Sequence, residues 1–315
     1  MTARGSYTLA MLLVSTCDPP GQAPDASPSP EPDAALIADA GVDATPPEPP
    51  CTAQLAAGDH HFTLELGGLR RTYRVHVPRG LPEGMRAPLL LNLHPSVLNG
   101  VGQALFSGMN GPADERGVIV AYPDGIEGSW NAGSCCGRAA RDQVDDVGFM
   151  REMIADLSHR GCIERRRVYA TGHSNGAHLA HRLACEAPEL IAAIAPASGV
   201  LRVPLEACRE GQPVPVLQFH GTEDSMVEFS DAGATVDTWV ARDGCTDPPR
   251  EIYRQGVVRC MAHDACRAGS KVVFCVAEGG GHCWPGSRWC PVGAPIRDID
   301  GNHYMLDFFD QFALP

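Results

Sequence analysis

The sequence of 315 residues contains no apolar run long enough to cross a membrane, since the run near its start, residues 9–14, is far too short. It also contains no Cys-x-x-Cys pair. That absence weakens a zinc-ribbon and a thioredoxin-like interpretation, because both need two sulfurs about one turn apart. Lysine plus arginine number 25 against 38 acidic residues, and the net charge is −13. Such an acidic chain is a poor candidate for nucleic-acid binding, which depends on neutralising phosphates with basic side chains.

The chain is 44% hydrophobic and 20% charged, a composition that suits a soluble globular protein with one sizeable domain. Residues 9–14 follow a single positive residue, Arg4, and we expect an export signal over residues 1–17. Its end, VSTC, resembles the bacterial lipoprotein cleavage box, in which the cysteine, here Cys17, is acylated. Thr16 is an atypical residue before that cysteine. Plain secretion and lipid anchoring through Cys17 therefore both stay open.

Residues 18–50 differ sharply from the rest, with ten prolines, seven acidic residues and no basic one. Proline stiffens such a segment, like charges extend it, and it has too few large apolar residues for a core, so we predict a disordered linker. The folded part, residues 51–315, then keeps a net charge of −7 once Arg4 and the linker are set aside. Twelve cysteines lie in it. This even number predicts an oxidising compartment and six disulfides, whose pairing the sequence does not decide.

The pattern of apolar residues predicts an α/β fold. Alternation around Gly67 and Gly68 is typical of an antiparallel hairpin over residues 61–78. Short apolar runs follow, most of them separated by enough chain for a crossover helix. These runs are residues 89–93, 118–121, 168–171, 191–197, 214–219 and 272–276. Helical spacing between Val144 and Leu157 predicts one clear helix capped by Asp142. We therefore expect a mainly parallel central sheet with helices on both faces.

The first candidate for chemistry is Ser174 in the stretch GHSNG. A strand, RVYAT, precedes it and a helical run, GAHLAHRLA, follows it, which is the context that the G-x-S-x-G nucleophile elbow requires. The backbone folds close upon itself at such a turn, so Gly172 and Gly176 leave room that a side chain would fill. The helix points free N–H groups at any oxyanion formed there. The alternative is a surface serine in an ordinary glycine turn.

A serine hydroxyl needs a base, and in this architecture the acid and then the histidine follow the serine along the chain. His282 comes after a predicted strand and three glycines, which let the backbone turn sharply and bring an imidazole to another loop. Asp224 lies in the loop after the run 214–219, at the same sheet edge. Glu223 and Asp231 are its rivals, and spacing alone leaves the choice among the three acids open.

Other histidines offer weaker alternatives. His178 and His181 are three apart on the helix after Ser174 and could bind a metal with Cys185, but no second ligand pair of suitable spacing accompanies them. We therefore expect no metal site. His220 ends a predicted strand, where a packed, hydrogen-bonded histidine is more common than a base.

Five motifs together resemble those of a known family. They are GHSNGA, LQFHGTED, GGGHCWPG, SWNAGSCCG at residues 129–137 and VDDVGF at residues 144–149. In combination they are similar to the secreted esterases grouped with polyhydroxybutyrate depolymerases, feruloyl esterases and acetyl xylan esterases of the carbohydrate esterase type. The resemblance covers most of residues 73–314. It implies an α/β-hydrolase fold with Ser174 as nucleophile, His282 as general base, Asp224 as orienting acid, and no cofactor.

One departure from that family concerns the oxyanion hole. Members usually read His-Gly after the first core strand, whereas LNLHPSV puts Pro95 in the glycine's place. Proline has no N–H and a fixed φ. We expect the donors to be the N–H groups of Ser96 and of Asn175, which directly follows the nucleophile.

Trp130, Trp284 and Trp289 fall near the predicted active loops, where their rings could stack on a sugar or a feruloyl group; core packing is the alternative. Trp239, at the end of a predicted helix, fits the core better. Cys283, beside His282, is expected to bridge to another cysteine and brace the catalytic loop.

These expectations add up to a secreted, monomeric serine esterase that acts on a polymer, most simply on feruloyl or acetyl esters of plant xylan. A polyhydroxybutyrate depolymerase would use the same three residues. A non-catalytic surface-binding protein with the same fold is the other class left open, and Pro95 is its support. A peptidase is a weaker option, although the triad does not exclude amide cleavage.

Overall fold

One ten-stranded sheet runs through the part of the chain that the structure, a computed structural model, describes: residues 51, 54–208 and 211–315. The predicted export signal, Cys17 and the linker lie outside the described residues. The strands, in pairing order, are β1 (Gly58–Leu66), β2 (Leu69–Val77), β4 (Ile119–Pro123), β3 (Ala87–Leu93), β5 (Ile163–His173), β6 (Ala193–Ala197), β7 (Val216–Gly221), β10 (Val272–Ala277), β9 (Val258–His263) and β8 (Arg250–Gln255). The central strands, β4 through β10 in this order, are parallel, and the two outer strands at each edge are antiparallel.

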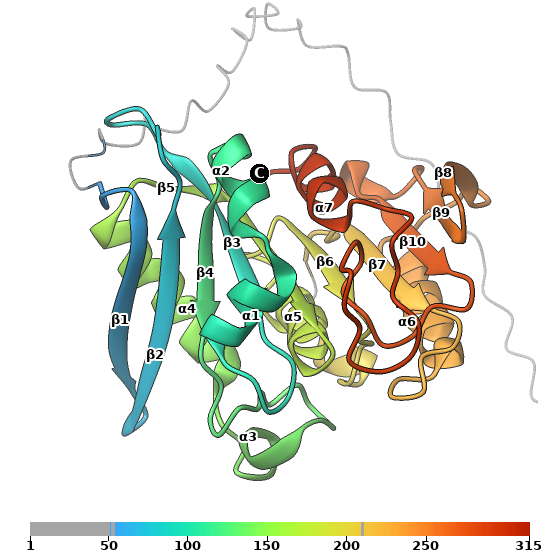
Figure 1. Cartoon of the computed structure of the whole chain (residues 1–315), viewed down its shortest axis with the longest axis horizontal. Helices are drawn as coiled ribbons and strands as arrows, with labels where there is room; N and C mark the ends of the chain where they lie inside the picture. Colours follow the sequence, from blue (N-terminus) through green and yellow to red (C-terminus); the bar gives the residue numbers. More distant parts are fainter. Residues whose placement is uncertain (1–50, 52–53, 209–210) are drawn as a thin grey trace, which may run out of the picture. The chain divides into compact units, whose positions relative to one another are not determined.

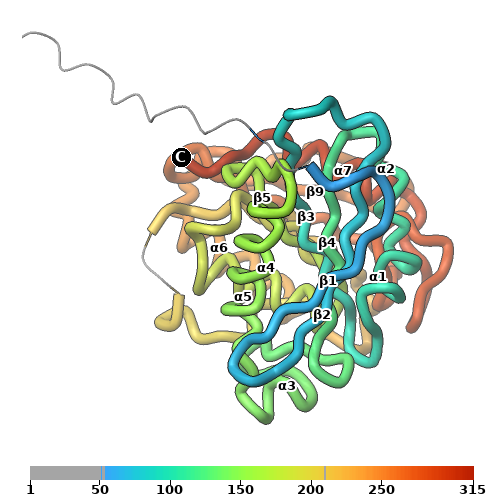
Figure 2. The backbone as a smooth tube through the Cα atoms, turned by 90° about the vertical axis from the view of Figure 1, so that its left-hand side faces the viewer, coloured from blue at the N-terminus to red at the C-terminus, as the bar shows by residue number. Residues whose placement is uncertain are grey.

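Helices cover both faces of this sheet (Figures 1 and 2). They are α1 (Gly100–Ser107), α2 (Asn110–Arg116), α3 (Gly137–Arg141), α4 (Asp146–Arg160), α5 (Asn175–Glu186), α6 (Phe229–Arg242) and α7 (Gly301–Phe309), with 3-10 turns at Leu205–Ala207 and Arg267–Gly269. In Figure 2, α4, α5 and α6 lie on one side of the strands and α1, α2 and α7 on the other. None of the described helices combines the length and the apolar character that a membrane span needs.

The two faces of the sheet carry separate apolar cores. Leu89 and Leu91 of β3 pack with α4 and α5 residues such as Phe149, whereas Leu90 packs with α7 residues such as Phe309. Successive residues of a strand point to opposite faces, so a strand buried on both sides reads as one continuous apolar run. This is why β3 is recognisable in the sequence although it shows no alternation.

The predicted fold class is confirmed, and so is the N-terminal hairpin. Gly67 and Gly68 form the turn between β1 and β2 with φ of 57° and 76°, values that favour glycine. The predicted cap of α4 is wrong. Asp145, not Asp142, accepts the backbone N–H of Gly148, because the chain first completes α3, whose C-terminal cap is Asp142. The pair β8 and β9 was not predicted.

Six disulfides join the twelve cysteines from Cys51 onward, which matches the number expected. They pair Cys51 with Cys162, Cys135 with Cys136, Cys185 with Cys208, Cys245 with Cys266, Cys260 with Cys275, and Cys283 with Cys290. The Cys260–Cys275 bridge joins facing residues of β9 and β10. It therefore ties the antiparallel edge to the parallel part of the sheet.

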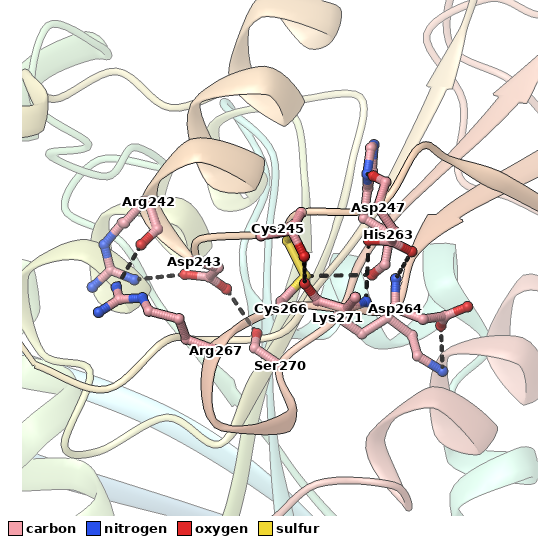
Figure 3. Close-up of a disulfide and its surroundings, with 12 residues drawn as sticks. Arg242, Asp243, Cys245, Asp247, His263, Asp264, Cys266, Arg267, Ser270 and Lys271 are labelled. Atoms are coloured by element: carbon pink, nitrogen blue, oxygen red, sulfur yellow. Dashed lines mark hydrogen bonds and ion pairs between the residues drawn. A yellow bond between two sulfur atoms is a disulfide. The ribbon is translucent and has the colours of Figure 1, made fainter.

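The Cys245–Cys266 bridge fastens the end of α6 to the segment after β9 (Figure 3). Around it, Asp247 accepts the backbone N–H groups of Asp264 and Ala265, and the buried Asp243 accepts the Ser270 hydroxyl at 2.7 Å. Side-chain acceptors thus replace the backbone partners that a loop lacks. The disulfide and these hydrogen bonds therefore anchor the segment that leads into β10, the strand that precedes His282.

Candidate active site

Ser174 occupies a strained turn between β5 and α5. Its backbone has φ 54° and ψ −117°, outside the regions that non-glycine residues favour. A Cβ added at Gly176 would come 2.2 Å from the Leu93 carbonyl oxygen, and one at Gly172 would come 2.6 Å from the Gly176 carbonyl carbon. Only glycine fits at both positions. The strand end of β3 therefore packs directly under the turn that lifts Ser174 above the sheet.

His282 and Asp224 meet across the loops that follow β10 and β7. The Nδ1 atom of His282 lies 2.8 Å from Oδ2 of Asp224, and both side chains are buried, with 5% and 4% exposed. The other oxygen, Oδ1, accepts the backbone N–H groups of Met226 and Val227 at 2.9 Å each. Backbone N–H groups of its own loop thus hold the Asp224 carboxylate, and the carboxylate in turn orients the imidazole of His282 through Nδ1. The other ring nitrogen, Nε2, remains to accept a proton.

The electrostatics keep this carboxylate charged. Burial by itself raises the pKa of Asp224, but the hydrogen bond to His282 and the N–H groups of Val227 and Met226 outweigh it, and the pKa lies below its usual value. The rival acids lie elsewhere. Glu223 is exposed, and Asp231 faces Arg202 at 3.4 Å. Of the three acids left open by spacing, only Asp224 contacts His282.

The glycines before His282 act through close backbone contact. A Cβ on Gly281 would come 2.3 Å from the Val292 carbonyl oxygen, and the backbone N–H of His282 donates to that same oxygen at 2.8 Å. Cys283 bridges to Cys290 within this loop, as expected. The imidazole is therefore mounted on a cross-linked loop.

His173 connects the Ser174 turn with the loop that carries His282, and the sequence analysis did not predict this role. Its ring lies 4.6 Å from the His282 ring, so the next residue, Ser174, belongs to the same site. Its ring nitrogens have no hydrogen-bond partner among the described residues. Burial lowers the pKa of His173 far below its usual value, so this ring stays neutral beside His282. Its position next to the serine was the available signal.

The two expected oxyanion donors lie on opposite sides of the turn. Asn175 begins α5, and Ser96 follows Pro95 in the loop after β3. Among the described residues, the backbone N–H groups of Ser96 and Asn175 donate to no protein acceptor. Gly176 lies against the His94 carbonyl oxygen, with a built Cβ only 2.7 Å away, so the loop after β3 and the start of α5 are in contact.

The side chain of Asn175 has a second role that the sequence did not reveal. Its Oδ1 accepts the Trp130 N–H at 2.8 Å, and its Nδ2 donates to the Trp130 carbonyl at 3.1 Å. The indole Nε1 of Trp130 donates to the His94 carbonyl at 2.9 Å. One tryptophan thus joins the start of α5 to the loop that carries Pro95 and Ser96.

A buried ion pair holds the segment that contains Trp130. Arg71 of β2 lies 2.6 Å from Oδ1 of Asp146, and both side chains are fully buried. The other oxygen of Asp146 accepts the Asn131 N–H at 2.7 Å. The motifs SWNAGSCCG and VDDVGF, which follow each other closely in sequence, therefore contact each other next to Trp130. Because Arg71 and Asp146 are 75 residues apart, no local pattern signals their contact.

The stacking role expected for Trp130 and Trp284 is wrong. These residues are 0% and 1% exposed, so neither has an open ring face on which a substrate could stack. Trp284 is fixed by a hydrogen bond from its Nε1 to Asn302. Trp289, by contrast, is 64% exposed. Trp239 is fully buried and donates to His181, which agrees with its expected place in the core.

The structure assembles no metal site from His178, His181 and Cys185. The sulfur of Cys185 is bonded to Cys208, and His181 lies between Trp239 and Gln218. His220 is buried with its Nε2 at 2.9 Å from the Val227 carbonyl, a packed histidine as expected.

One other group of metal-binding residue types occurs among the described residues. Cys135, Cys136 and His178 offer ligand atoms within 4.8 Å of one another, but the two sulfurs form a disulfide and are not available as thiolates.

Comparison with known proteins identifies the family. No protein-family model matches the chain. It is 30% identical to a protein of Nocardia uniformis subsp. tsuyamanensis named as an esterase, NocK, over 84% of this chain and 91% of that protein. It is also 30% identical to feruloyl esterase B of Piromyces equi over 76% of this chain, which spans 45% of that longer protein. Feruloyl esterase D of Neurospora crassa is 25% identical over 70% of this chain and 76% of its own length.

Solved structures agree on the fold. The acetyl xylan esterase from Aspergillus awamori superimposes with a TM-score of 0.62 at 17% identity, covering 80% of this chain and 99% of that one. The ferulic acid esterase of Anaeromyces mucronatus gives a TM-score of 0.51 at 15% identity, covering 76% of this chain and 87% of that one. The chain therefore has the α/β-hydrolase fold and belongs to the family of carboxylic ester hydrolases that includes NocK and these feruloyl esterases.

Proposed function

We propose that the protein is a secreted serine esterase that hydrolyses feruloyl or acetyl esters on plant xylan, with Ser174, His282 and Asp224 as its catalytic residues. The observation that carries this proposal is the contact between His282 and Asp224, two residues 58 apart, beside the strained turn of Ser174. Nucleophile, base and orienting acid in this relation define acyl-transfer chemistry on several unrelated folds.

In the proposed reaction the Ser174 hydroxyl attacks the ester carbonyl carbon while Nε2 of His282 takes the hydroxyl proton. Asp224 keeps the remaining ring proton on Nδ1 and stabilises the imidazolium. The N–H groups of Asn175 and Ser96 donate to the oxyanion. When the carbon–oxygen bond to the alcohol breaks, His282 returns its proton to the leaving oxygen. Water then attacks the acyl-enzyme by the same path and releases the acid.

Pro95 does not weaken this proposal. The N–H of the next residue, Ser96, has no acceptor among the described residues and can serve as the second donor, and the Pro95 carbonyl accepts the N–H of Leu98 at 3.3 Å. The non-catalytic alternative rested on Pro95 alone, so no observation favours it over an enzyme.

The choice of ester rests on the relatives. Two of the relatives reported above are named as feruloyl esterases, and the two solved structures as an acetyl xylan esterase and a ferulic acid esterase. Six disulfides suit a protein that works outside the cell on a polymer. No contact in the described residues favours a polyester over a sugar ester.

Product analysis tests the proposal directly. The purified protein and its Ser174→Ala variant are incubated separately with feruloylated arabinoxylan, acetylated xylan and polyhydroxybutyrate film. We expect ferulate or acetate from the first two substrates with the parent protein alone. Release of 3-hydroxybutyrate as the sole product, or equal release by the Ser174→Ala variant, would contradict it.

A further inference from the structure

A cavity of about 710 Å³ opens beside the candidate active site. Its walls come from the end of α1, the segment after β10, the start of α7 and the end of β8. Figures 1 and 2 show α1 and the red loop that leads from β10 to α7 on the same side of the sheet. Neither Ser174, Asp224 nor His282 lines the cavity, so it is a separate space that adjoins the reacting groups.

Phe106 connects this cavity with the catalytic residues. Its ring lies 5.0 Å from His173, whose ring contacts His282. The same ring lies 6.3 Å from Trp284 and 5.6 Å from the exposed Trp289. A ligand in the cavity can therefore contact Phe106, which only the ring of His173 separates from His282.

Two tyrosines also line the cavity. Tyr253 and Tyr304 stand edge to face with ring centres 5.3 Å apart, and both residues are partly exposed. These aromatic rings give the cavity apolar surface, against which the carbon-bound hydrogens of a sugar ring can pack.

Hydrogen-bonding groups line the same cavity. Arg297 is exposed in the cavity wall, and Gln255 adds an amide. The Tyr304 hydroxyl has no hydrogen-bond partner within the described residues. Asp300 and Asp307 add carboxylate oxygens. This mixture of donors and acceptors matches a ligand rich in hydroxyl groups, each of which both donates and accepts.

The two carboxylates keep capacity for a ligand. Asp300 accepts from the backbone and ring of His303, and Oδ1 of Asp307 pairs with Arg116. A carboxylate offers about four lone-pair sites, so each of these groups can accept a further hydrogen bond from the cavity side.

We propose that this cavity is a carbohydrate subsite, which holds sugar residues on the alcohol side of the ester that Ser174 attacks. This rests on the proposed esterase function and adds the place where the glycan binds. An aliphatic polyester offers carbonyl acceptors but no donors along its chain, so it cannot donate to the remaining acceptor sites of Asp300 and Asp307. A glycan hydroxyl can.

The test compares two substrates with the same acyl group. The ratio of kcat/KM for a feruloylated arabinoxylo-oligosaccharide to that for methyl ferulate isolates the contribution of the sugar. We expect Arg297→Ala and Tyr304→Phe each to lower this ratio about fivefold, chiefly through KM of the oligosaccharide ester. Arg259→Ala is the matched control, since Arg259 is exposed on β9 and lies outside the cavity wall. Thermal melting confirms that each variant is folded.

Binding without turnover separates this proposal from the esterase assignment. The Ser174→Ala protein is titrated with unesterified xylotriose by calorimetry, and the titration is repeated with Tyr304→Phe added. Millimolar binding that weakens in the double variant supports the subsite even if no ester tested is cleaved. An unchanged substrate ratio in both cavity variants, or no xylotriose binding, overturns it. So does hydrolysis of 3-hydroxybutyrate oligomers that depends on Arg297 and Tyr304 more than hydrolysis of the sugar ester does.

Discussion

Replacing Asp224 by asparagine tests the catalytic assignment without disturbing its geometry. The amide introduced by Asp224→Asn would keep an oxygen for the N–H groups of Met226 and Val227, which now bind Oδ1 at 2.9 Å. Its NH₂ group would then face Nδ1 of His282 in place of the carboxylate oxygen at 2.8 Å. Two donors cannot face each other, so the imidazole would place its proton on Nε2, the atom that must accept the proton of Ser174.

The expected cost is large. A base held in the wrong tautomer lowers kcat by about 10⁴, which corresponds to about 5.4 kcal/mol of transition-state stabilisation. Hydrolysis of p-nitrophenyl acetate at saturating substrate measures it, and circular dichroism checks the fold. Asp231→Asn is the matched control, because this rival acid faces Arg202 and not the imidazole. Asp224→Asn with more than a tenth of the parent kcat, or an equal loss in Asp231→Asn, would refute the reasoning.

Three further predictions concern the surroundings of the site. Asn175→Ala removes both bonds to the Trp130 backbone and should lower the free energy of unfolding by about 2 kcal/mol in urea titrations; an unchanged midpoint would contradict it. Ser96→Pro removes the proposed oxyanion N–H and should lower kcat about a hundredfold, whereas Ser96→Ala, which keeps it, should stay within about twofold; equal rates would exclude Ser96. Burial lowers the pKa of His178 to about 4 and that of His181 to about 3, so the unfolded chain binds more protons below pH 6.5. Stability should fall on acidification through this window, by roughly 2 kcal/mol per histidine at pH 5, and equal urea midpoints at pH 7.5 and 5 would argue against it.

The parts of the fold that the sequence predicted are those in which the local pattern and the final environment agree. Strand β3 is apolar throughout most of its length because both its faces are buried, and the turn at Ser174 needs glycine on both sides because Leu93 lies against it. By contrast, β8 reads REIYRQ and is mostly exposed, so it carries no apolar signal and was missed. The cap of α4 was placed at Asp142 because the short helix α3, which Asp142 ends, was not predicted.

The parts of the site that could not be predicted depend on contacts between distant segments. Spacing could not choose between Asp224 and Asp231, because the choice is made by which loop lies beside His282. The buried state of Trp130 depends on Asn175 and His94, 45 and 36 residues away. Whether a tryptophan in a loop packs inward or faces solvent is decided by such partners and not by its neighbours in sequence.

Labelling with a fluorophosphonate, which reacts with activated serine hydroxyls, tests the central claim most directly. The account predicts one covalent adduct, located by mass spectrometry on the peptide that contains Ser174, absent from Ser174→Ala and strongly slowed in His282→Ala. An adduct on another residue, or an unlabelled parent protein that still hydrolyses p-nitrophenyl acetate, would contradict it.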